Sequence, residues 1–213
     1  MKYTRCYRLP KYIAANPTRS IRLPPADVSS IALPRTRQIA RSWYRIHPSA
    51  HHAIHFSLVP TYRYSHPDCP HKFLYVAIDA ATCLWERFGD ILFDEGHVVP
   101  KTQWDDTSIS TIDVPPLHLC DLARTNTRSA LTVDLTALMN DDISVPQQWG
   151  LAIQTHPSQV PAIKFKSRFT GSACLALLDR GVLPTQLMET CLGPLNSYHP
   201  ALNWLVKNKV SLV

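Results

Sequence analysis

The chain has 213 residues, 45% hydrophobic and 18% charged, which suits one packed domain and excludes a chain that is disordered throughout. No stretch approaches the ~18 apolar residues of a membrane span, and no signal-peptide core follows the first residues, so we expect a cytoplasmic protein without membrane contact. The net charge of +6 is uneven: residues 1–45 hold ten Lys or Arg and one acid, whereas residues 46–213 hold twelve bases and fifteen acids.

Residues 1–40 are rich in proline and weakly periodic, so we expect a basic arm outside the core with one short helix, followed by a catalytic domain over residues 41–213. Such an arm binds either nucleic acid or an acidic partner, or it wraps its own acidic body. The second interpretation is favoured, because the arm lacks the interleaved aromatic residues that stack on bases. Its prolines also argue against the amphipathic helix of a transit peptide.

From Ser42 onward, short runs of aromatic and β-branched residues bounded by Pro, His and Asp predict strands. In chain order these runs are residues 43–46, 54–59, 72–78, 109–114, 162–166 and 174–178. Residues 131–135 fit either a strand or a buried turn. The arrangement predicts an α+β domain with a twisted, mostly antiparallel sheet.

Asp79 predicts the N-cap of a helix that runs to about Phe88, so that the strand carrying Tyr75 leads directly into the helix carrying Glu86. Pro146 predicts the first residue of another helix, with Trp149 among the apolar positions at helical spacing. A short helix is also expected over residues 201–207.

Cysteine and histidine patterns give little evidence of a metal or a disulfide framework. The six cysteines form no CxxC pair and are expected to be reduced and mostly buried. Six histidines crowd residues 47–71 beside Cys69, which leaves a zinc hydrolase open as an alternative. Pro48 and Pro60 interrupt any helix that could carry such ligands, so we expect polar loop histidines and no metal site.

Glycine spacing excludes the common nucleotide cradles. The closest two of the six glycines are Gly89 and Gly96, so neither GxGxxG nor a P-loop can be drawn. A diphosphate would then be held by side chains, and arginine meets phosphate oxygens with a planar fork. Two arginines, an aromatic ring, a carboxylate and a hydroxyl suit NAD, which has a diphosphate, a flat ring and a bond that breaks toward a cation. These candidates are Arg45, Arg63, Tyr75, Glu86 and Ser167.

The order of short motifs over residues 42–180 resembles the RES-domain family, which is named for its Arg, Glu and Ser. The motifs are Tyr44-Arg45-Ile46, Arg63-Tyr64, Leu74-Tyr75, Glu86-Arg87-Phe88, Ser167-Arg168 and Ala176-Leu177-Leu178-Asp179. Two departures stand out: Tyr64 replaces the usual Phe, and Pro161-Ala162-Ile163 replaces the Gly that commonly precedes the Ser-Arg pair.

The resemblance implies an ADP-ribosyltransferase-like fold, a twisted, mostly antiparallel sheet with short flanking helices. It also implies a toxin that degrades NAD at the nicotinamide–ribose bond, as an NAD glycohydrolase or an NAD phosphorylase. NAD is then the substrate rather than a bound cofactor, and inorganic phosphate is a candidate co-substrate. The expected partner is an Xre-like helix-turn-helix antitoxin, through which DNA would be bound only indirectly. A homo-oligomer is left open.

Within this scheme Glu86 stabilises the positive charge on the ribose, and Tyr75 stacks on nicotinamide. Each residue also has a structural interpretation: Glu86 as a solvated helix position, Tyr75 as a half-buried strand residue and the arginines as surface ion pairs. The expected catalytic residues are Glu86, Arg45 and Ser167, and the expected substrate-binding residues are Arg45, Arg63, Tyr75, Ser167 and Tyr44.

Two further functions remain open from sequence alone. One keeps the fold and transfers ADP-ribose to a macromolecule. The other is non-catalytic, with the basic arm binding nucleic acid or a protein partner in a strongly salt-dependent way.

Overall fold

The computed structural model describes residues 22–94 and 96–213. Residues 1–21, the larger part of the expected basic arm, lie outside this range. The strands are β1 (Arg35–Gln38), β2 (Arg41–Pro48), β3 (Phe73–Ala77), β4 (Val98–Val99), β5 (Thr107–Val114), β6 (Leu117–Asp121), β7 (Ala162–Lys166), β8 (Ala173–Leu178), β9 (Met188–Pro194) and β10 (Ser211–Leu212). The α-helices are α1 (Ala80–Asp94), α2 (Lys101–Asp105), α3 (Thr125–Ala130), α4 (Leu135–Leu138), α5 (Ser144–Thr155) and α6 (His199–Asn208), with 3-10 turns at Val28–Ser30 and Pro184–Gln186.

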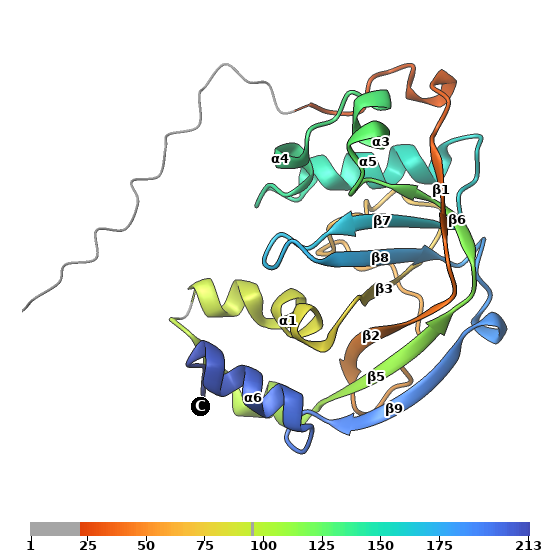
Figure 1. Cartoon of the computed structure of the whole chain (residues 1–213). Helices are drawn as coiled ribbons and strands as arrows, with labels where there is room; N and C mark the ends of the chain where they lie inside the picture. Colours follow the sequence, from red (N-terminus) through yellow and green to blue (C-terminus); the bar gives the residue numbers. More distant parts are fainter. Residues whose placement is uncertain (1–21, 95) are drawn as a thin grey trace, which may run out of the picture.

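Eight strands form one sheet in the order β1-β6-β7-β8-β3-β2-β5-β9. All neighbours are antiparallel except β6 and β7, which are parallel. The sheet curves around α1, with α5 and α6 on either side of that helix (Figure 1). The strands β4 and β10 form a separate parallel pair. The predicted α+β class with a mostly antiparallel sheet is therefore confirmed.

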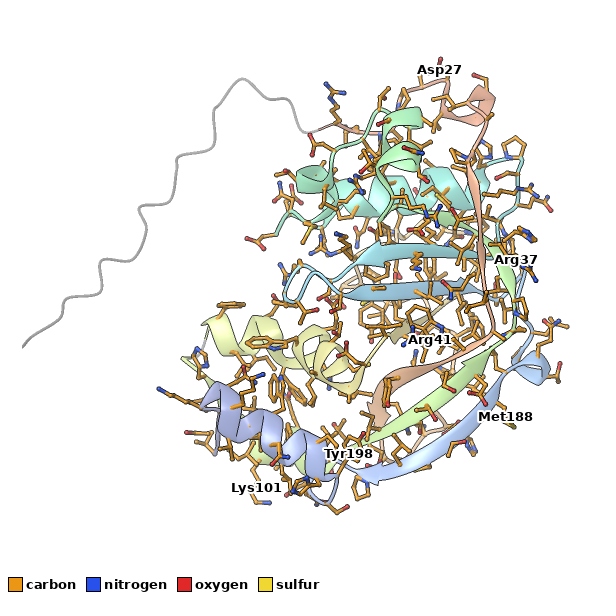
Figure 2. All side chains as sticks on the ribbon, viewed as in Figure 1. Asp27, Arg37, Arg41, Lys101, Met188 and Tyr198 are labelled. Carbon is orange, nitrogen blue, oxygen red and sulfur yellow. The ribbon has the colours of Figure 1, made fainter. Side chains whose placement is uncertain are left out.

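The expectation that residues 1–40 lie outside the core is wrong for the described part of that segment. Strand β1 pairs with β6 over four residues from Arg35 to Gln38, and Leu33 is buried in the main core. The sequence of β1, Arg-Thr-Arg-Gln, carries no apolar alternation, because an edge strand that lies half in solvent needs little of it. Figure 2 shows Arg37 of β1 and Met188 of β9 on the outer side of the sheet, away from α1.

Helix α1 begins as predicted and ends six residues later than predicted. The Asp79 carboxylate accepts the backbone N–H of Thr82 at 2.7 Å, which is the N-cap hydrogen bond. Leu84, Phe88 and Leu92 recur every four residues and are fully buried against β5, α2 and α6. Because this apolar stripe continues past Phe88, the helix extends to Asp94. Glu86 lies outside this stripe and keeps solvent contact.

Strands β2 and β3 are adjacent in the sheet and share one residue pair, Tyr44 with Ala77. Beyond this pair β2 continues to pair with β5, and the loop of residues 49–72 connects β2 to β3. Ala53 of this loop packs on one face of the sheet and Tyr64 packs on the other. The loop therefore passes through the sheet at the split between the two strands.

The prediction of a strand over residues 54–59 is wrong, because these residues belong to the loop between β2 and β3. Only Ser57 forms a β-bridge in this stretch, with Phe73 of β3. The apolar residues Ile54 and Phe56 pack against the core formed by Trp43, Leu74 and Val76 without joining a ladder. A short apolar run thus signalled burial rather than a strand.

The remaining helices cover the face of the sheet that carries Tyr64. Helix α5 starts at Ser144, two residues before the predicted Pro146, and buries Trp149 and Ile153 against the sheet. Residues 131–135 form a buried turn into α4, with Leu131 and Val133 in the same core. The late helix expected over residues 201–207 is confirmed as α6.

Four described cysteines are buried thiols, namely Cys69, Cys83, Cys120 and Cys174, and Cys191 is exposed on β9. Among the described helices, none has the length and apolar character needed to cross a membrane.

Candidate active site

A cavity of about 310 Å³ opens where β2 and β3 separate, between α1 and residues 61–63 of the loop. Four of the residues expected from the sequence line this cavity together: Arg45, Arg63, Tyr75 and Glu86. They come from β2, the loop, β3 and α1. Its other lining residues are Ile46, Thr61, Tyr62, Val76, Ala77, Cys83, Arg87, Asp90, Phe165 and Cys174. The split in the sheet thus creates the hollow in which these side chains meet.

Ser167 supports the site from behind Glu86. It is fully buried in the turn between β7 and β8, and its hydroxyl donates to Oε1 of Glu86 at 2.5 Å. The hydroxyl oxygen of Ser167 also accepts the backbone N–H groups of Phe169 and Thr170 at 3.2 and 3.3 Å. The serine therefore fixes the carboxylate through a turn that is itself hydrogen-bonded. The structure brings Ser167 to Glu86 and leaves it outside the cavity lining.

Gly89 explains how this turn can approach α1 so closely. A Cβ at Gly89 would lie 2.6 Å from ring atoms of Phe169, so only glycine leaves room for that ring. Phe169 also stacks with Trp85 and Phe93, both on α1, at ring-centroid distances of 6.1 and 6.0 Å. The aromatic packing holds the turn on the helix three residues after Glu86.

Glu86 keeps solvent contact at the cavity, yet protein atoms crowd its carboxylate. This partial desolvation raises the pKa of Glu86, and the Ser167 hydrogen bond and the charges of Arg63 and Arg168 oppose the rise without cancelling it. The structural interpretation of Glu86 as an ordinary solvated position does not fit a carboxylate with these neighbours.

Arg45 closes the split in the sheet. Its Nη1 donates to the carbonyl of Tyr75 at 3.1 Å, and its Nη2 donates to the carbonyl of His55 at 3.3 Å. The guanidinium thus satisfies a β3 carbonyl beyond the point where β2 leaves the ladder. Its Nε is buried without a partner among the described residues, and burial lowers the pKa of Arg45. The interpretation as a surface ion pair is therefore wrong for this arginine.

Tyr75 lies half-buried at the cavity with its hydroxyl already engaged. That hydroxyl accepts the backbone N–H of Tyr64 at 3.2 Å and lies 3.1 Å from the Ser65 hydroxyl. Burial raises the pKa of Tyr75, so the phenol is neutral at physiological pH. Tyr62 meets the Tyr75 ring edge-on, with centroids 5.2 Å apart, and is itself 42% exposed. The ring of Tyr75, rather than its hydroxyl, is left for a ligand.

Arg63 ties the loop to α4. Its Nη1 donates to the carbonyls of Leu138 and Asn140 at 2.9 Å each, at the C-terminal end of that helix. Cations are favoured at helix C-termini, where carbonyls lack intrahelical partners. Arg63 therefore reaches the cavity from a position fixed by its other contacts.

Tyr44 does not line the cavity. Its ring packs between two core clusters, and its carbonyl accepts the thiol of Cys83 at 3.0 Å. Arg168, next to Ser167, has contacts that the sequence did not reveal. It bonds Asp141 at 2.6 Å and also Asp90, and its guanidinium lies 4.6 Å from the Phe169 ring centroid. The only sequence signal for these ion pairs was the position of Arg168 next to Ser167.

The histidines of residues 47–71 do not form a metal centre among the residues with described positions, where no group of three or more His, Cys, Asp or Glu side chains could hold an ion. His47 contacts Ser110, His66 contacts Gln148, and His71 contacts Asp179, each in a separate part of the fold.

A comparison with protein-family models matches residues 42–190 to the RES domain, which is more than half of the chain. The chain belongs to the RES-domain family. This RES protein also matches one chain in the crystal structure of the M. tuberculosis MbcT–MbcA toxin–antitoxin complex, with a TM-score of 0.65 and 19% identity over 83% of this chain and 97% of that chain. That likeness establishes a shared fold. A comparison with curated protein sequences finds no match.

Proposed function

We propose that this RES protein cleaves the nicotinamide–ribose bond of NAD, with water or inorganic phosphate as the acceptor. The observation that carries the proposal is the Glu86 carboxylate, fixed by Ser167 at the edge of a cavity that Tyr75, Arg45 and Arg63 also line. The cavity volume of about 310 Å³ lies at the lower end of the range for small-molecule sites.

In the proposed reaction the bond between ribose C1′ and the nicotinamide nitrogen breaks, and both electrons leave with nicotinamide. Positive charge then develops on the ribose, as in glycoside cleavage. The carboxylate of Glu86 stabilises that charge and accepts a hydrogen bond from a ribose hydroxyl. A water or phosphate oxygen then forms a bond to C1′, and in the hydrolytic reaction the attacking water releases a proton to the solvent. Preorganised charge of this kind is worth about 10² to 10³ in rate.

The other cavity residues have roles that follow from their positions. The half-buried ring of Tyr75, which lines the cavity with Tyr62 edge-on beside it, offers a flat surface for nicotinamide. Arg63 supplies the guanidinium that meets the diphosphate, because this side chain lines the cavity. Its Nη1 is held in place by the carbonyls of Leu138 and Asn140 at the end of α4. Arg45 completes the cavity floor. We assign residues 41–213 to the catalytic domain, with β1 as a strand added to its sheet.

We further propose that the protein is a toxin held inactive by an antitoxin partner. The family, and the toxin–antitoxin complex among the matched structures, support this assignment. An Xre-like helix-turn-helix antitoxin is the expected partner, and any DNA contact would pass through it.

The test is incubation of purified protein with NAD, with and without phosphate, while free nicotinamide is followed by chromatography. Glu86→Gln keeps the size of the side chain and should lower release by about 10² to 10³. Asp68→Asn is the matched control, because this side chain is 80% exposed and is not among the residues that line the cavity. A phosphate requirement would identify a phosphorylase.

Absence of nicotinamide release from folded wild-type protein under both conditions would refute NAD degradation. Release that occurs only with a macromolecular acceptor, together with its covalent ADP-ribosylation, would identify the transferase alternative.

A further inference from the structure

Glu189 is a half-buried carboxylate at the edge of the sheet that the proposed reaction does not use. It follows Met188, which Figure 2 shows at the outer edge of the sheet, away from α1. Its Oε2 accepts the backbone N–H groups of Ala53 and Ile54 at 2.9 and 3.4 Å, and its Oε1 accepts the Ser110 hydroxyl at 3.3 Å. Three donors on one carboxylate mark a built structural site.

The strand register places Glu189 and Arg45 on the same face of the sheet. Ser110 lies opposite Arg45 in the β2–β5 pair and opposite Cys191 in the β5–β9 pair. Glu189 precedes Cys191 by two residues, so its side chain points to the same face as Arg45 and Ser110. One strand, β5, therefore lies between the strand that carries Glu189 and the strand that carries Arg45.

A short stretch of backbone connects the two side chains. Glu189 accepts the N–H groups of residues 53 and 54, and the carbonyl of the following residue, His55, accepts Nη2 of Arg45. Nη1 of the same arginine then binds the carbonyl of Tyr75 at the cavity. Moving Glu189 would move the turn, and the turn would release one of the two hydrogen bonds that orient the guanidinium.

The electrostatic surroundings of Arg45 also connect it with Glu189. Burial lowers the pKa of Arg45, and three groups favour its charged form: Tyr62, Cys83 and Glu189. Burial raises the pKa of Cys83 to about 12, so this thiol carries no charge near pH 7. Glu189 is the carboxylate of this set.

We propose that Glu189 is a positioning residue, which holds the Arg45 guanidinium at the cavity through its charge and through the turn at residues 53–55. The proposal rests on the proposed function only for its activity readout.

The test is a double-mutant cycle of Glu189→Gln and Arg45→Gln, measured by kcat and KM for nicotinamide release. Glutamine at 189 keeps an oxygen for the backbone N–H groups and removes the charge, whereas Glu189→Asp keeps the charge with a shorter reach. Thr190→Ala is the control, because Thr190 lies exposed on the same strand and points to the other face.

Glu189→Gln should lower kcat/KM by about tenfold to a hundredfold. This loss should be divided between kcat and KM in the same way as the loss caused by Arg45→Gln. A general loss of stability would not reproduce that division. In the Arg45→Gln background the effect should vanish, Glu189→Asp should restore part of the rate, and Thr190→Ala should match wild type. An equal effect in both backgrounds, or a Glu189→Gln variant that matches wild type, would overturn the proposal.

The denaturant midpoints of the four proteins of the cycle separate this proposal from the proposed function. These proteins are wild type, Glu189→Gln, Arg45→Gln and the double variant. If wild type releases no nicotinamide, the proposed reaction fails, and the cycle is then evaluated on the midpoints. A shift from Glu189→Gln that disappears in the Arg45→Gln background supports the positioning role, and an additive shift refutes it. Should Glu189→Gln fail to fold, Ser110→Ala replaces it with the same criterion, because Ser110 donates to the same carboxylate.

Discussion

The hydroxyl of Ser167 donates to Oε1 of Glu86 over 2.5 Å, and this one contact joins the turn after β7 to the middle of α1. The two residues are 81 positions apart in the chain. The orientation of the carboxylate therefore depends on how the turn packs on the helix, and the proposed chemistry depends on that orientation.

The pKa of Glu86 predicts the acidic limb of the pH–rate profile. Crowding by protein atoms raises this pKa above the ordinary value for glutamate. Because the reaction needs the carboxylate form, kcat/KM should rise with pH through the raised pKa and level off above it. Nicotinamide release measured between about pH 4 and pH 8 would locate the limb, and a midpoint near the ordinary ~4.3 would contradict the prediction.

The same pKa shift predicts that Glu86 destabilises the fold at neutral pH. A raised pKa means that the folded state binds the proton more tightly than the unfolded state, so stability falls as pH rises from the unfolded pKa through the folded one. Glu86→Gln should therefore increase the free energy of unfolding at pH 7. The gain should disappear below about pH 4, where both states of the wild type are protonated. Denaturant unfolding at the two pH values checks this, with Asp68→Asn as the control that should show no such gain.

Ser167→Ala should lower both activity and stability. The variant loses the donor to Glu86 and leaves the N–H groups of Phe169 and Thr170 without their acceptor, which costs about 1–3 kcal/mol of unfolding free energy. Since the serine hydrogen bond lowers the pKa of Glu86, its loss should move the acidic limb to higher pH. Ser172→Ala is the matched control in the same turn, where the backbone carbonyl of Ser172, not its hydroxyl, binds Ser167. An unchanged pH profile in Ser167→Ala would contradict the role of the hydrogen bond.

Gly89→Ala should separate activity from helix stability. Alanine is the better helix former by about 1 kcal/mol, yet its Cβ would meet the Phe169 ring at 2.6 Å. The ring must move, and the turn carrying Ser167 moves with it, so we expect nicotinamide release to fall more than the unfolding free energy does. In a Phe169→Leu background the substitution should cost much less activity. Equal losses of activity in both backgrounds would show that the close approach of the turn is unimportant.

Much of the central sheet could be predicted from sequence, because β3, β5, β7 and β8 are largely buried and rich in apolar residues, and β2 carries the run Trp43-Tyr44-Arg45-Ile46. The two edges could not. The sequence of β1 is wholly polar, and β9 contains Gly193 and Pro194, which argue against a strand unless it lies at an edge. Residues 54–59 failed in the opposite direction, since burial without a ladder gives the same apolar run.

The candidate site divides in a similar way. Residue types that suit a diphosphate and a cation pointed to Arg45, Arg63, Tyr75 and Glu86, and the fold places all four around one cavity. Sequence could not show that Ser167 faces Glu86 and lies outside the cavity lining, because that depends on the packing of Phe169 over Gly89. Nor could it show Glu189, whose significance depends entirely on a turn 135 residues away.

The guanidinium of Arg45 takes the place of the backbone N–H that a neighbouring strand would donate to β3. It binds the carbonyls of His55 and Tyr75. Every residue type has a carbonyl, so the residues at positions 55 and 75 could change without removing these acceptors. Position 55 would then look unconstrained in any alignment of related chains, although its main chain binds an arginine that lines the cavity. Only position 45 would record the requirement. Lysine there would keep the charge but lacks the planar fork that spans two acceptors.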